Sequence, residues 1–323
     1  PRITVMGLGH FGGGAGVTRW LVEHRGARVR LTDLATADQL AHSLDVIRDL
    51  VESGHVELRL GEHEERDFTD AELVVANPAV PRPWENAYLQ AARGAGVPIT
   101  TEIELLIGTL PTRERVIAVT GTAGKSTTAA MIHHALSRRG AAHLGGNLGG
   151  TLLGLTIDPD AWVVLEVSSA MLHWLGAGST RFAPHIAVIT NFSDNHVDWH
   201  GSLEHYQRSK QHVLLHQQPG DAAVLGPGLE HWKTAKGVDR TDVSSQDTRL
   251  GGIELLLPGH HNRLNALVAA AACAAAGMER ETALTAIATY PGLPHRLQLI
   301  AQAQDGRRFY NDSKCTTPAA AAL

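Results

Sequence analysis

The sequence predicts an α/β fold built on more than one parallel sheet, and three observations support this prediction. Short runs of β-branched and aliphatic residues alternate with helical patterns along the chain. Two glycine-rich turns, at residues 7–12 and 121–126, each stand between a predicted strand and a predicted helix. The chain has 323 residues, and typical domains have ~100–200, so about two domains are expected.

Composition narrows the class of protein. The formal net charge is −5, which does not favour nucleic acid as a partner. The two cysteines cannot build a disulfide framework, and such low usage is typical of a reducing compartment. The nearly apolar stretch at residues 266–278 is shorter than the roughly 20 residues of a membrane-spanning helix, so it predicts a buried helix. We expect a cytoplasmic protein without a membrane partner.

Residues 1–99 are predicted to form a Rossmann-like domain. Its expected strands are 2–6, 28–32, 56–60 and 72–76, and its expected helices include 17–21, 37–51 and 84–93. Gly7, Gly9 and Gly12 form a G-x-G-x-x-G turn after the first strand, and Asp33 ends the second strand. Such a turn lets the backbone approach a pyrophosphate, and the acid can hold a ribose hydroxyl. Alone, the motif favours a nicotinamide-dependent oxidoreductase, although any nucleotide diphosphate fits the same geometry.

Residues 100–293 are predicted to form a central P-loop-type ATPase domain with a parallel sheet. Its expected strands are 116–120, 162–167 and 186–190, and its expected helices are 125–139, 202–216 and 262–277. The turn after its first strand consists of Gly121, Thr122, Ala123, Gly124, Lys125, Ser126 and Thr127. The amides of residues 122–125 are expected to surround a β-phosphate, Lys125 to reach the β and γ oxygens, and Ser126 to bind Mg²⁺. Two phosphate-binding turns in one chain weaken the oxidoreductase interpretation, because a dehydrogenase needs one nucleotide.

Three further side chains extend the second site. Glu166 ends a buried strand, where Mg²⁺ would need a carboxylate, although a structural hydrogen-bonding role is the alternative. His196 follows another strand and is a candidate ligand or substrate contact, and Lys210 on the next helix can return to the same cleft. His196 and His200 have the spacing of a zinc-protease helix, but Val197 stands where the catalytic glutamate is required, which excludes that class.

Residues 294–323 are predicted to begin a third domain. A proline-rich stretch at 291–294 marks a linker, and β-like runs follow at 297–301 and 308–310.

Together these motifs resemble the Mur ligase family. The resemblance spans the whole chain and is carried by seven segments: 121–126 (GTAGKS), 145–149 (GGNLG), 166–169 (EVSS), 191–198 (NFSDNHVD), 259–265 (GHHNRLN), 293–296 (LPHR) and 311–318 (NDSKCTTP). It implies an ATP-dependent, amide-forming ligase of peptidoglycan precursor synthesis, acting through an acyl phosphate. The last segment is closest to the family branch that adds D-glutamate to UDP-N-acetylmuramoyl-L-alanine.

The resemblance also implies roles for individual residues. Lys125, Glu166, His196 and Lys210 would be catalytic. Two Mg²⁺ ions would be held by Ser126 and Glu166, and by His196 and a carbamate on Lys210. The UDP-substrate would contact Gly9, His10, Phe11, Gly12, Asp33, Asn147 and His196. ATP would contact the P-loop together with Asn262, Asn265, Arg296, Asp312 and Lys314.

The chain also departs from the family's pattern. Met171 replaces a glutamine, Asn195 stands where an acid commonly precedes the histidine, and Asn77 and Leu34 alter the expected uridine contacts. The family carries a complete Rossmann-like third domain for the incoming amino acid, so we expect this chain to be a piece of a longer, monomeric protein. The alternatives left open are a ligase for another amino acid, a NAD-linked oxidoreductase, and a nucleotide-binding regulator without turnover.

Overall fold

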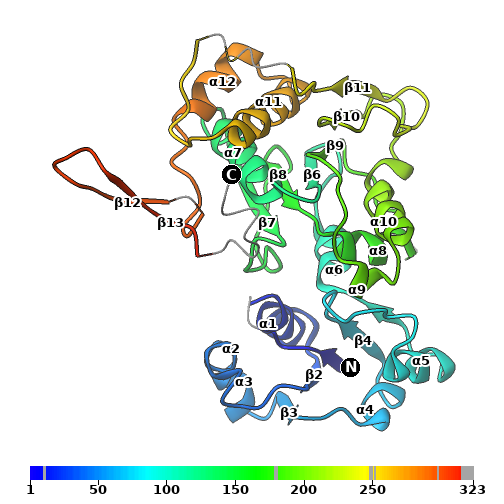
Figure 1. The fold of residues 1–323 in the computed structure, drawn as a ribbon. Coiled ribbons are helices and arrows are strands. Elements are labelled where there is room, and N and C mark those ends of the chain that lie inside the picture. Colours follow the sequence, from blue (N-terminus) through cyan, green and yellow to red (C-terminus); the bar gives the residue numbers. More distant parts are fainter. Residues whose placement is uncertain (10–11, 178–180, 247–249, 251, 297, 314–323) are drawn as a thin grey trace.

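The computed structural model describes residues 1–9, 12–177, 181–246, 250, 252–296 and 298–313. Two parallel sheets lie one beyond the other, and a small antiparallel hairpin projects from the body (Figure 1). Every helix in these ranges is too short or too polar to span a bilayer. The α/β class with parallel sheets predicted from the alternating pattern is therefore confirmed.

The first sheet has the strand order β3-β2-β1-β4-β5, and all of its pairs are parallel. The strands are β1 (Arg2–Met6), β2 (Arg28–Asp33), β3 (Val56–Leu60), β4 (Leu73–Ala76) and β5 (Ile99–Thr100). The helices are α1 (Gly13–Arg25), α2 (Ala41–Asp45), α3 (Arg48–Glu52), α4 (Glu65–Thr69) and α5 (Ala87–Gly94). The strand order reverses direction between β1 and β4, which is where ligands bind in open α/β sheets.

The predicted extent of one helix in this domain was wrong. Residues 37–51 form two short helices, α2 and α3, instead of one. Ile47 lies between them with φ −117° and ψ 13°, outside the helical region, and its side chain is fully buried. The chain bends here so that this side chain enters the core. The helix expected at 84–93 begins later, at Ala87, where Asn86 caps it by accepting from the Leu89 amide.

The second sheet has the order β11-β10-β9-β6-β8-β7, again entirely parallel. The strands are β6 (Val116–Thr120), β7 (Ala142–Gly146), β8 (Trp162–Glu166), β9 (Ile186–Ile189), β10 (Ala222–Leu225) and β11 (Asp239–Asp242). The helices are α6 (Glu102–Thr109), α7 (Lys125–Leu136), α8 (Ser169–Ala177), α9 (Val197–His200), α10 (Leu203–Leu215), α11 (His260–Ala275) and α12 (Arg280–Ala288). The switch in strand order falls between β6 and β9.

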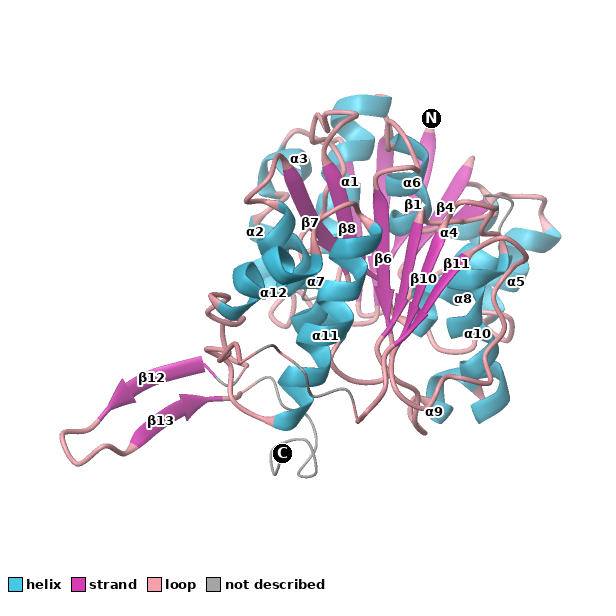
Figure 2. Ribbon diagram, turned by 90° about the horizontal axis from the view of Figure 1, so that it is seen from above, coloured by secondary structure: helices cyan, strands magenta, loops and turns pink. Residues whose placement is uncertain are grey.

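The central sheet is covered on both faces. Ile117 and Val119 of β6 join the core formed with α7, α11 and α12, whereas Val116 and Ala118 join the core on the side of α8 and α10. This double burial explains why β6 is a continuous apolar run. Figure 2 shows α7, α11 and α12 gathered on one side of the strands and α8 and α10 on the other.

The junction between the sheets is packed rather than open. One apolar cluster runs from the first sheet through Ile103 and Leu106 of α6 to the central sheet. A second contact is aromatic: Trp84 of the first domain and Trp199 of α9 have ring centroids 6.0 Å apart. The Trp199 indole N–H donates to the Ala79 carbonyl at 3.2 Å, and the Arg82 amide donates to the Trp199 carbonyl at 3.3 Å.

The hairpin consists of β12 (Gln298–Gln302) and β13 (Arg308–Asn311), which pair antiparallel. These strands were expected from the β-like runs at 297–301 and 308–310. Leu299, Ile300 and Phe309 on the hairpin are exposed.

Candidate active site

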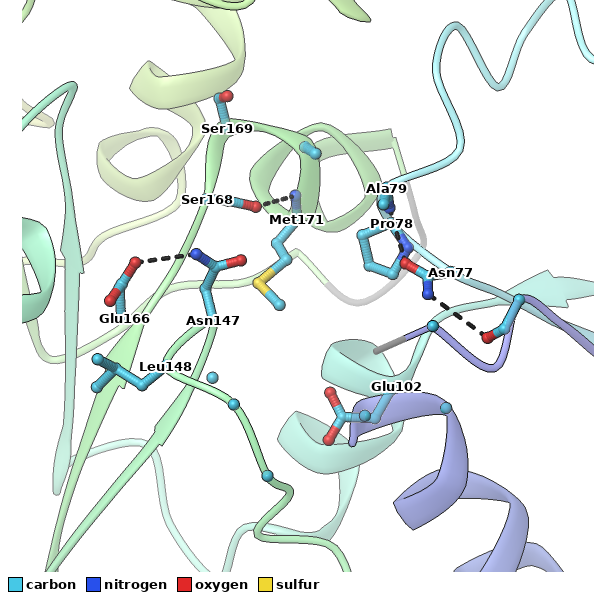
Figure 3. Close-up of a pocket in the computed structure, with 18 of the residues that line it drawn as sticks. Asn77, Pro78, Ala79, Glu102, Asn147, Leu148, Glu166, Ser168, Ser169 and Met171 are labelled. Atoms are coloured by element: carbon cyan, nitrogen blue, oxygen red, sulfur yellow. Dashed lines mark hydrogen bonds between the residues drawn. The ribbon is translucent and has the colours of Figure 1, made fainter. Parts of the chain in front are cut away.

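A cavity of about 890 Å³ lies where the carboxyl ends of the two sheets meet. It brings together eight of the residues predicted to act, from segments far apart in sequence. They are Gly9, Lys125, Ser126, Asn147, Glu166, His196, Lys210 and Arg296. Figure 3 shows the part of this cavity between Glu166 and Asn147 on one side and Asn77 and Pro78 on the other.

The first glycine turn forms one wall of the cavity. Gly7 and Gly9 have φ values of +93° and +64°, which side chains other than hydrogen rarely allow. A Cβ on Gly7 would lie 2.9 Å from Cβ of Asn77, so the turn after β1 and the segment after β4 approach closely at the switch point. The Asn77 side chain accepts from the Ala79 amide at 2.9 Å and donates to the Gly7 carbonyl at 3.5 Å.

Asp33 was expected to hold a ribose, and here it organises the turn itself. Its Oδ2 accepts from the amides of Leu8 (2.8 Å) and Gly9 (3.3 Å), and its Oδ1 accepts from Ala35 (2.9 Å). Both oxygens therefore bind backbone, and Asp33 does not line the cavity. The predicted contacts His10 and Phe11 lie outside the described residues; Gly12 caps α1 at φ +85°.

The second glycine turn connects β6 to α7 and is fixed by the segment after β9. The Thr122 amide donates to the Asn191 carbonyl at 3.1 Å, and the Ala123 amide donates to the Asn191 side chain at 2.9 Å. Two of the four amides expected to face a phosphate are therefore already hydrogen-bonded within the protein. Gly121 and Gly124 are required: a Cβ would lie 1.9 Å from Thr190 Oγ1 and 2.3 Å from Asn265 Oδ1, respectively.

Lys125 and Ser126 begin α7 at the cavity wall. The Lys125 Nζ donates to the Thr122 carbonyl at 3.0 Å, which folds the side chain back along the turn. Burial lowers the pKa of Lys125, the Glu166 carboxylate raises it, and the charge of Arg296 lowers it further. Ser126 is buried and lines the cavity. Thr127 follows on α7 but does not line it.

Glu166 is the carboxylate beside the second glycine turn. It ends β8 with 1% of its surface exposed, and its Oε1 accepts from Asn147 Nδ2 at 3.0 Å. Its Oε2 is buried and has no hydrogen-bond partner. An unpaired buried carboxylate oxygen is costly, and a hard divalent cation such as Mg²⁺ prefers such ligands. The donor set of Glu166 and the Ser126 hydroxyl therefore fits Mg²⁺ at this point.

Lys210 reaches the same cavity from α10. It is 1% exposed; its Nζ donates to the Gly121 carbonyl at 2.7 Å and lies 4.6 Å from the centre of the Tyr206 ring. Burial and the nearby charge of Lys125 lower the pKa of Lys210 well below its usual range, which the Glu166 carboxylate only partly opposes. The amine thus tends to lose its proton, and a neutral amine is a nucleophile.

His196 stands at the cavity rim, at the start of α9. It adopts the left-handed region with φ 50°, unusual for a residue other than glycine, and its amide donates to the Asn195 side chain. Partial burial, then the charges of Lys125 and Lys210, lower the pKa of His196. A neutral imidazole is the form that accepts a proton or binds a cation.

Other predicted contacts lie outside the cavity wall. Asn262 and Asn265 are buried on α11; Asn262 Nδ2 donates to the Pro258 carbonyl at 2.7 Å, and Asn265 packs against the P-loop at Gly124. Asp312 follows β13 and lies near His261; burial and the charge of His260 lower the pKa of His261, and Asp312 only partly opposes this. Lys314 lies outside the described residues. Across the described ranges, no three His, Cys, Asp or Glu side chains come together as a metal-binding group.

Two further residues at the site, Glu102 and Thr151, belong to no motif that could be recognised in the sequence. Glu102 is the first residue of α6 and lines the cavity, and Thr151 Oγ1 donates to its Oε1 at 2.5 Å. Acids in the first turn of a helix are common as dipole partners, so the sequence gives no signal for a further role.

Comparisons with known proteins show the family of the chain. Residues 119–241 match the Mur ligase middle domain. A protein from Roseiflexus sp. (strain RS-1) is 36% identical over 357 residues, covering 99% of this chain and 74% of its own. One from Geobacter metallireducens (strain ATCC 53774 / DSM 7210 / GS-15) is 33% identical, covering 98% of this chain and 72% of its own. Both are named UDP-N-acetylmuramoylalanine–D-glutamate ligase.

Solved structures support the fold. The UDP-N-acetylmuramate:L-alanyl-γ-D-glutamyl-meso-diaminopimelate ligase from Neisseria meningitides has a TM-score of 0.60 at 18% identity, covering 90% of this chain and 98% of that one. The UDP-N-acetylmuramate–alanine ligase from Thermotoga maritima has a TM-score of 0.58 at 23% identity, covering 94% and 72%.

The chain therefore belongs to the Mur ligase family, a class of ATP-dependent ligases of peptidoglycan precursor synthesis. Within the family it groups with the proteins named UDP-N-acetylmuramoylalanine–D-glutamate ligase, and it is an acid–amino-acid ligase. The nicotinamide interpretation of the first glycine turn is set aside, because these relatives are ligases.

Proposed function

We propose that this chain carries out the ATP-dependent addition of D-glutamate to UDP-N-acetylmuramoyl-L-alanine. The observation that carries the proposal is one cavity that is lined by the first glycine turn, by Lys125 and Ser126 after the second glycine turn, and by Glu166 at the end of β8. A UDP-linked substrate on the first sheet and ATP on the second would meet in that cavity. We assign residues 1–99 to the UDP-substrate, residues 100–293 to ATP, and residues 294–323 to the start of the amino-acid-binding part.

The chemistry requires activation of a carboxylate. An amine cannot displace oxide from a carboxylate, so the substrate carboxylate first attacks the γ-phosphorus of ATP and ADP leaves. The resulting acyl phosphate has a good leaving group. The D-glutamate amine then attacks the acyl carbon, loses a proton and expels inorganic phosphate, forming the amide. Phosphoryl transfer of this kind depends mainly on positioning and on stabilising negative charge.

The residues of the central sheet supply that stabilisation. Lys125 and Arg296 would neutralise the phosphate oxygens, and Lys125 is held at the turn by the Thr122 carbonyl. Ser126 and Glu166 would hold one Mg²⁺, with the unpaired Glu166 Oε2 as a direct ligand. When bound, Mg²⁺ neutralises the crowded oxyanions of the phosphates.

Lys210 and His196 would hold a second Mg²⁺. Lys210 is a buried amine with a depressed pKa, so it fits carbamoylation: the neutral nitrogen adds to CO₂ and a proton leaves. The product is an anionic oxygen ligand in place of a cation. Tyr206, whose ring lies under Nζ, would support the aliphatic stem in either state.

The remaining contacts are proposed from the family pattern. Gly9, His10, Phe11, Gly12 and Asp33 would hold the uridine diphosphate, with Asp33 acting through the turn that it organises. Asn147 and His196 would face the sugar and alanyl end. The residues proposed to surround adenine, ribose and phosphates are Asn262, Asn265, Asp312 and Lys314.

The proposal is tested by phosphate release from ATP by the full-length protein. Release should require UDP-N-acetylmuramoyl-L-alanine and D-glutamate together; release with L-glutamate or a diamino acid instead would contradict the D-glutamate assignment. Calorimetric titration should show binding of UDP-N-acetylmuramoyl-L-alanine in preference to UDP-N-acetylglucosamine. Lys125→Ala should abolish acyl phosphate formation, whereas Lys236→Ala, at an exposed lysine, should not.

A further inference from the structure

The loop that follows β7 spans the cavity from one sheet to the other. At its start, Asn147 Nδ2 donates to Glu166 Oε1, the oxygen beside the unpaired Oε2. Gly146 has φ +86°, and a Cβ there would lie 2.2 Å from the Glu166 carbonyl oxygen, so the loop leaves β7 tightly against β8. The first half of the loop therefore sets the orientation of the Glu166 carboxyl group.

The end of the loop is held by the first domain and by α6. The Thr151 hydroxyl donates to Glu102 Oε1 at 2.5 Å and accepts from the Leu153 amide at 3.1 Å, so its hydrogen-bonding capacity is used on both sides. Its methyl group packs on α1: a Cβ on Gly16 would lie 2.3 Å from Thr151 Cγ2. Thr151 is thus enclosed between α1 and α6.

The same loop touches the start of α1. A Cβ built on Gly12 would lie 3.7 Å from the Gly150 amide nitrogen. Gly12 caps α1, whose N-terminal end faces the cavity through Gly13 and Gly14. An anion at that helix end would therefore lie beside the loop, since helix N-termini attract negative charge.

Glu102, in the wall of the cavity, holds the end of this loop through its hydrogen bond with Thr151. It is the first residue of α6, where the capping box of Thr101 and Glu104 fixes the helix start. Figure 3 shows its carboxyl group among the residues that line the cavity. Burial raises the pKa of Glu102, and the Thr151 hydrogen bond opposes that rise. Glu102 is the acceptor that fixes the Thr151 hydroxyl, and with it the end of the loop.

We propose that Thr151 and Glu102 are positioning residues that couple the two nucleotide sites of this ligase through the loop at residues 146–151. Ligand bound at the start of α1 restrains the loop at Gly150 and Thr151, and the loop presents Asn147 to Glu166 at the ATP site. The proposal rests on the proposed function, because it needs a UDP-linked substrate on the first sheet. Coupling of this kind is reciprocal: each ligand tightens the other by the same factor.

The test measures affinity for the β,γ-imido analogue of ATP with Mg²⁺, with and without saturating UDP-N-acetylmuramoyl-L-alanine. In the unmodified protein, saturating UDP-N-acetylmuramoyl-L-alanine should lower the Kd of the ATP analogue by about 5-fold or more. The ratio of the Kd without this substrate to the Kd with it measures the coupling. Thr151→Val keeps the shape of the side chain but removes the hydroxyl, and it should bring this ratio close to 1. Each affinity measured alone should change by no more than about 2-fold, since Thr151 is proposed to touch neither ligand.

Two further variants separate positioning from a structural role. Thr151→Ser keeps the hydroxyl and should retain the ratio, although it loses the methyl contact with Gly16. Glu102→Ala removes the acceptor and should bring the ratio of affinities close to 1, while Glu102→Gln keeps an acceptor oxygen and should retain most of the coupling; because Glu102 lines the cavity, only the ratio, and not each affinity alone, is compared for these two variants. Should Thr151→Val fail to fold, the contrast between Glu102→Ala and Glu102→Gln decides the question.

Failures of the two proposals are distinguishable. If the unmodified protein binds both ligands with a ratio of 1, or if Thr151→Val and Glu102→Ala keep the full ratio, the coupling proposal is overturned and the proposed function stands. If the unmodified protein does not bind UDP-N-acetylmuramoyl-L-alanine at all, the proposed function itself fails.

Discussion

The side-chain nitrogen of Lys210 lies 2.7 Å from the carbonyl oxygen of Gly121, and this hydrogen bond joins α10 to the turn after β6. The two residues are 89 positions apart, so the contact exists only because the central sheet brings α10 under the P-loop. Lys210 is as buried as a core leucine. Burial of an amine beside a second lysine disfavours its protonated form.

Replacement of Lys210 tests its proposed carbamate. Lys210→Ala should reduce turnover by about 100-fold or more, the usual loss when one charge-stabilising group leaves an active site. Formate or acetate should restore part of the activity, because a small carboxylate fits the space vacated by the side chain. Turnover measured against formate concentration checks this. Lys233→Ala, at an exposed lysine, should show no formate effect; equal stimulation of both variants would contradict the carbamate.

Replacement of Glu166 separates function from stability. Glu166→Gln keeps the shape of the side chain and its acceptor toward Asn147 but removes a buried charge. The Mg²⁺ concentration for half-maximal activity should rise by roughly 10-fold or more. In metal-free buffer the variant loses the desolvation cost of a buried carboxylate and also its attraction to Lys125 and Lys210, so the two effects oppose each other and the free energy of unfolding should change by less than about 1 kcal/mol. Urea unfolding beside Mg²⁺ titration measures both, and a large loss of stability with unchanged Mg²⁺ requirement would argue for a structural role.

Gly124 tests the packing of the P-loop on α11. Gly124→Ala places a side chain at φ +78°, with its Cβ 2.3 Å from Asn265 Oδ1. The free energy of unfolding should fall by about 1–3 kcal/mol. Asn265→Ala removes the oxygen with which the new Cβ would clash. The loss in free energy of unfolding caused by Gly124→Ala should therefore be smaller in the Asn265→Ala background than in the unmodified protein. Additive losses in urea unfolding would mean that the backbone angle, not the contact, determines the cost.

Because of the histidines at the sheet junction, we expect the protein to lose stability at acidic pH. Burial, followed by charges of neighbouring histidines, lowers the pKa of His173 to about 4 and of His200 to about 3, and burial also lowers the pKa of His205. Below the ordinary histidine pKa of 6.5 the unfolded chain binds protons that the folded chain does not. Stability is therefore fully present above pH 6.5 and is lost as the pH falls toward 4.

The measurement is Tm against pH. His173→Gln removes one of these groups, so the fall in Tm between pH 6.5 and 4.5 should be shallower than in the unmodified protein. His231→Gln, at an exposed histidine, should leave the slope unchanged. Parallel curves for the unmodified protein and His173→Gln would show that this residue does not contribute to the acid response.

The predictable parts of the fold are those in which the local pattern and the tertiary environment agree. The sequence-predicted bounds of β1 and β6 match the structure, because buried parallel strands are dense in branched apolar residues. The bounds of the edge strand β3 also match, where apolar Val56, Leu58 and Leu60 alternate with charged residues. β7 was missed because Gly145 and Gly146 carry no side chains that favour a strand. β11 was missed because it is a charged edge strand with only one partner, β10.

In the site, too, residues that belong to a local motif were predictable and contacts between distant segments were not. Lys125 and Ser126 follow from a local motif, whereas Thr151 meets Glu102 across 49 positions and Asn191 fixes the P-loop across 68. These contacts arise from the packing of sheets and loops against each other, and no spacing in the sequence encodes them.

The indole contact at the sheet junction gives the molecule an internal optical probe. Trp84 belongs to the first domain and Trp199 to the second, and both pack on imidazole rings, Trp84 4.6 Å from His205 and Trp199 4.4 Å from His200. A rotation of one sheet against the other changes the separation of Trp84 from His205 and from Trp199, because these two contacts cross the junction. The chain has six tryptophans, so the part of the emission that a Trp84→Phe variant loses is the part that reports on the junction, without any attached dye.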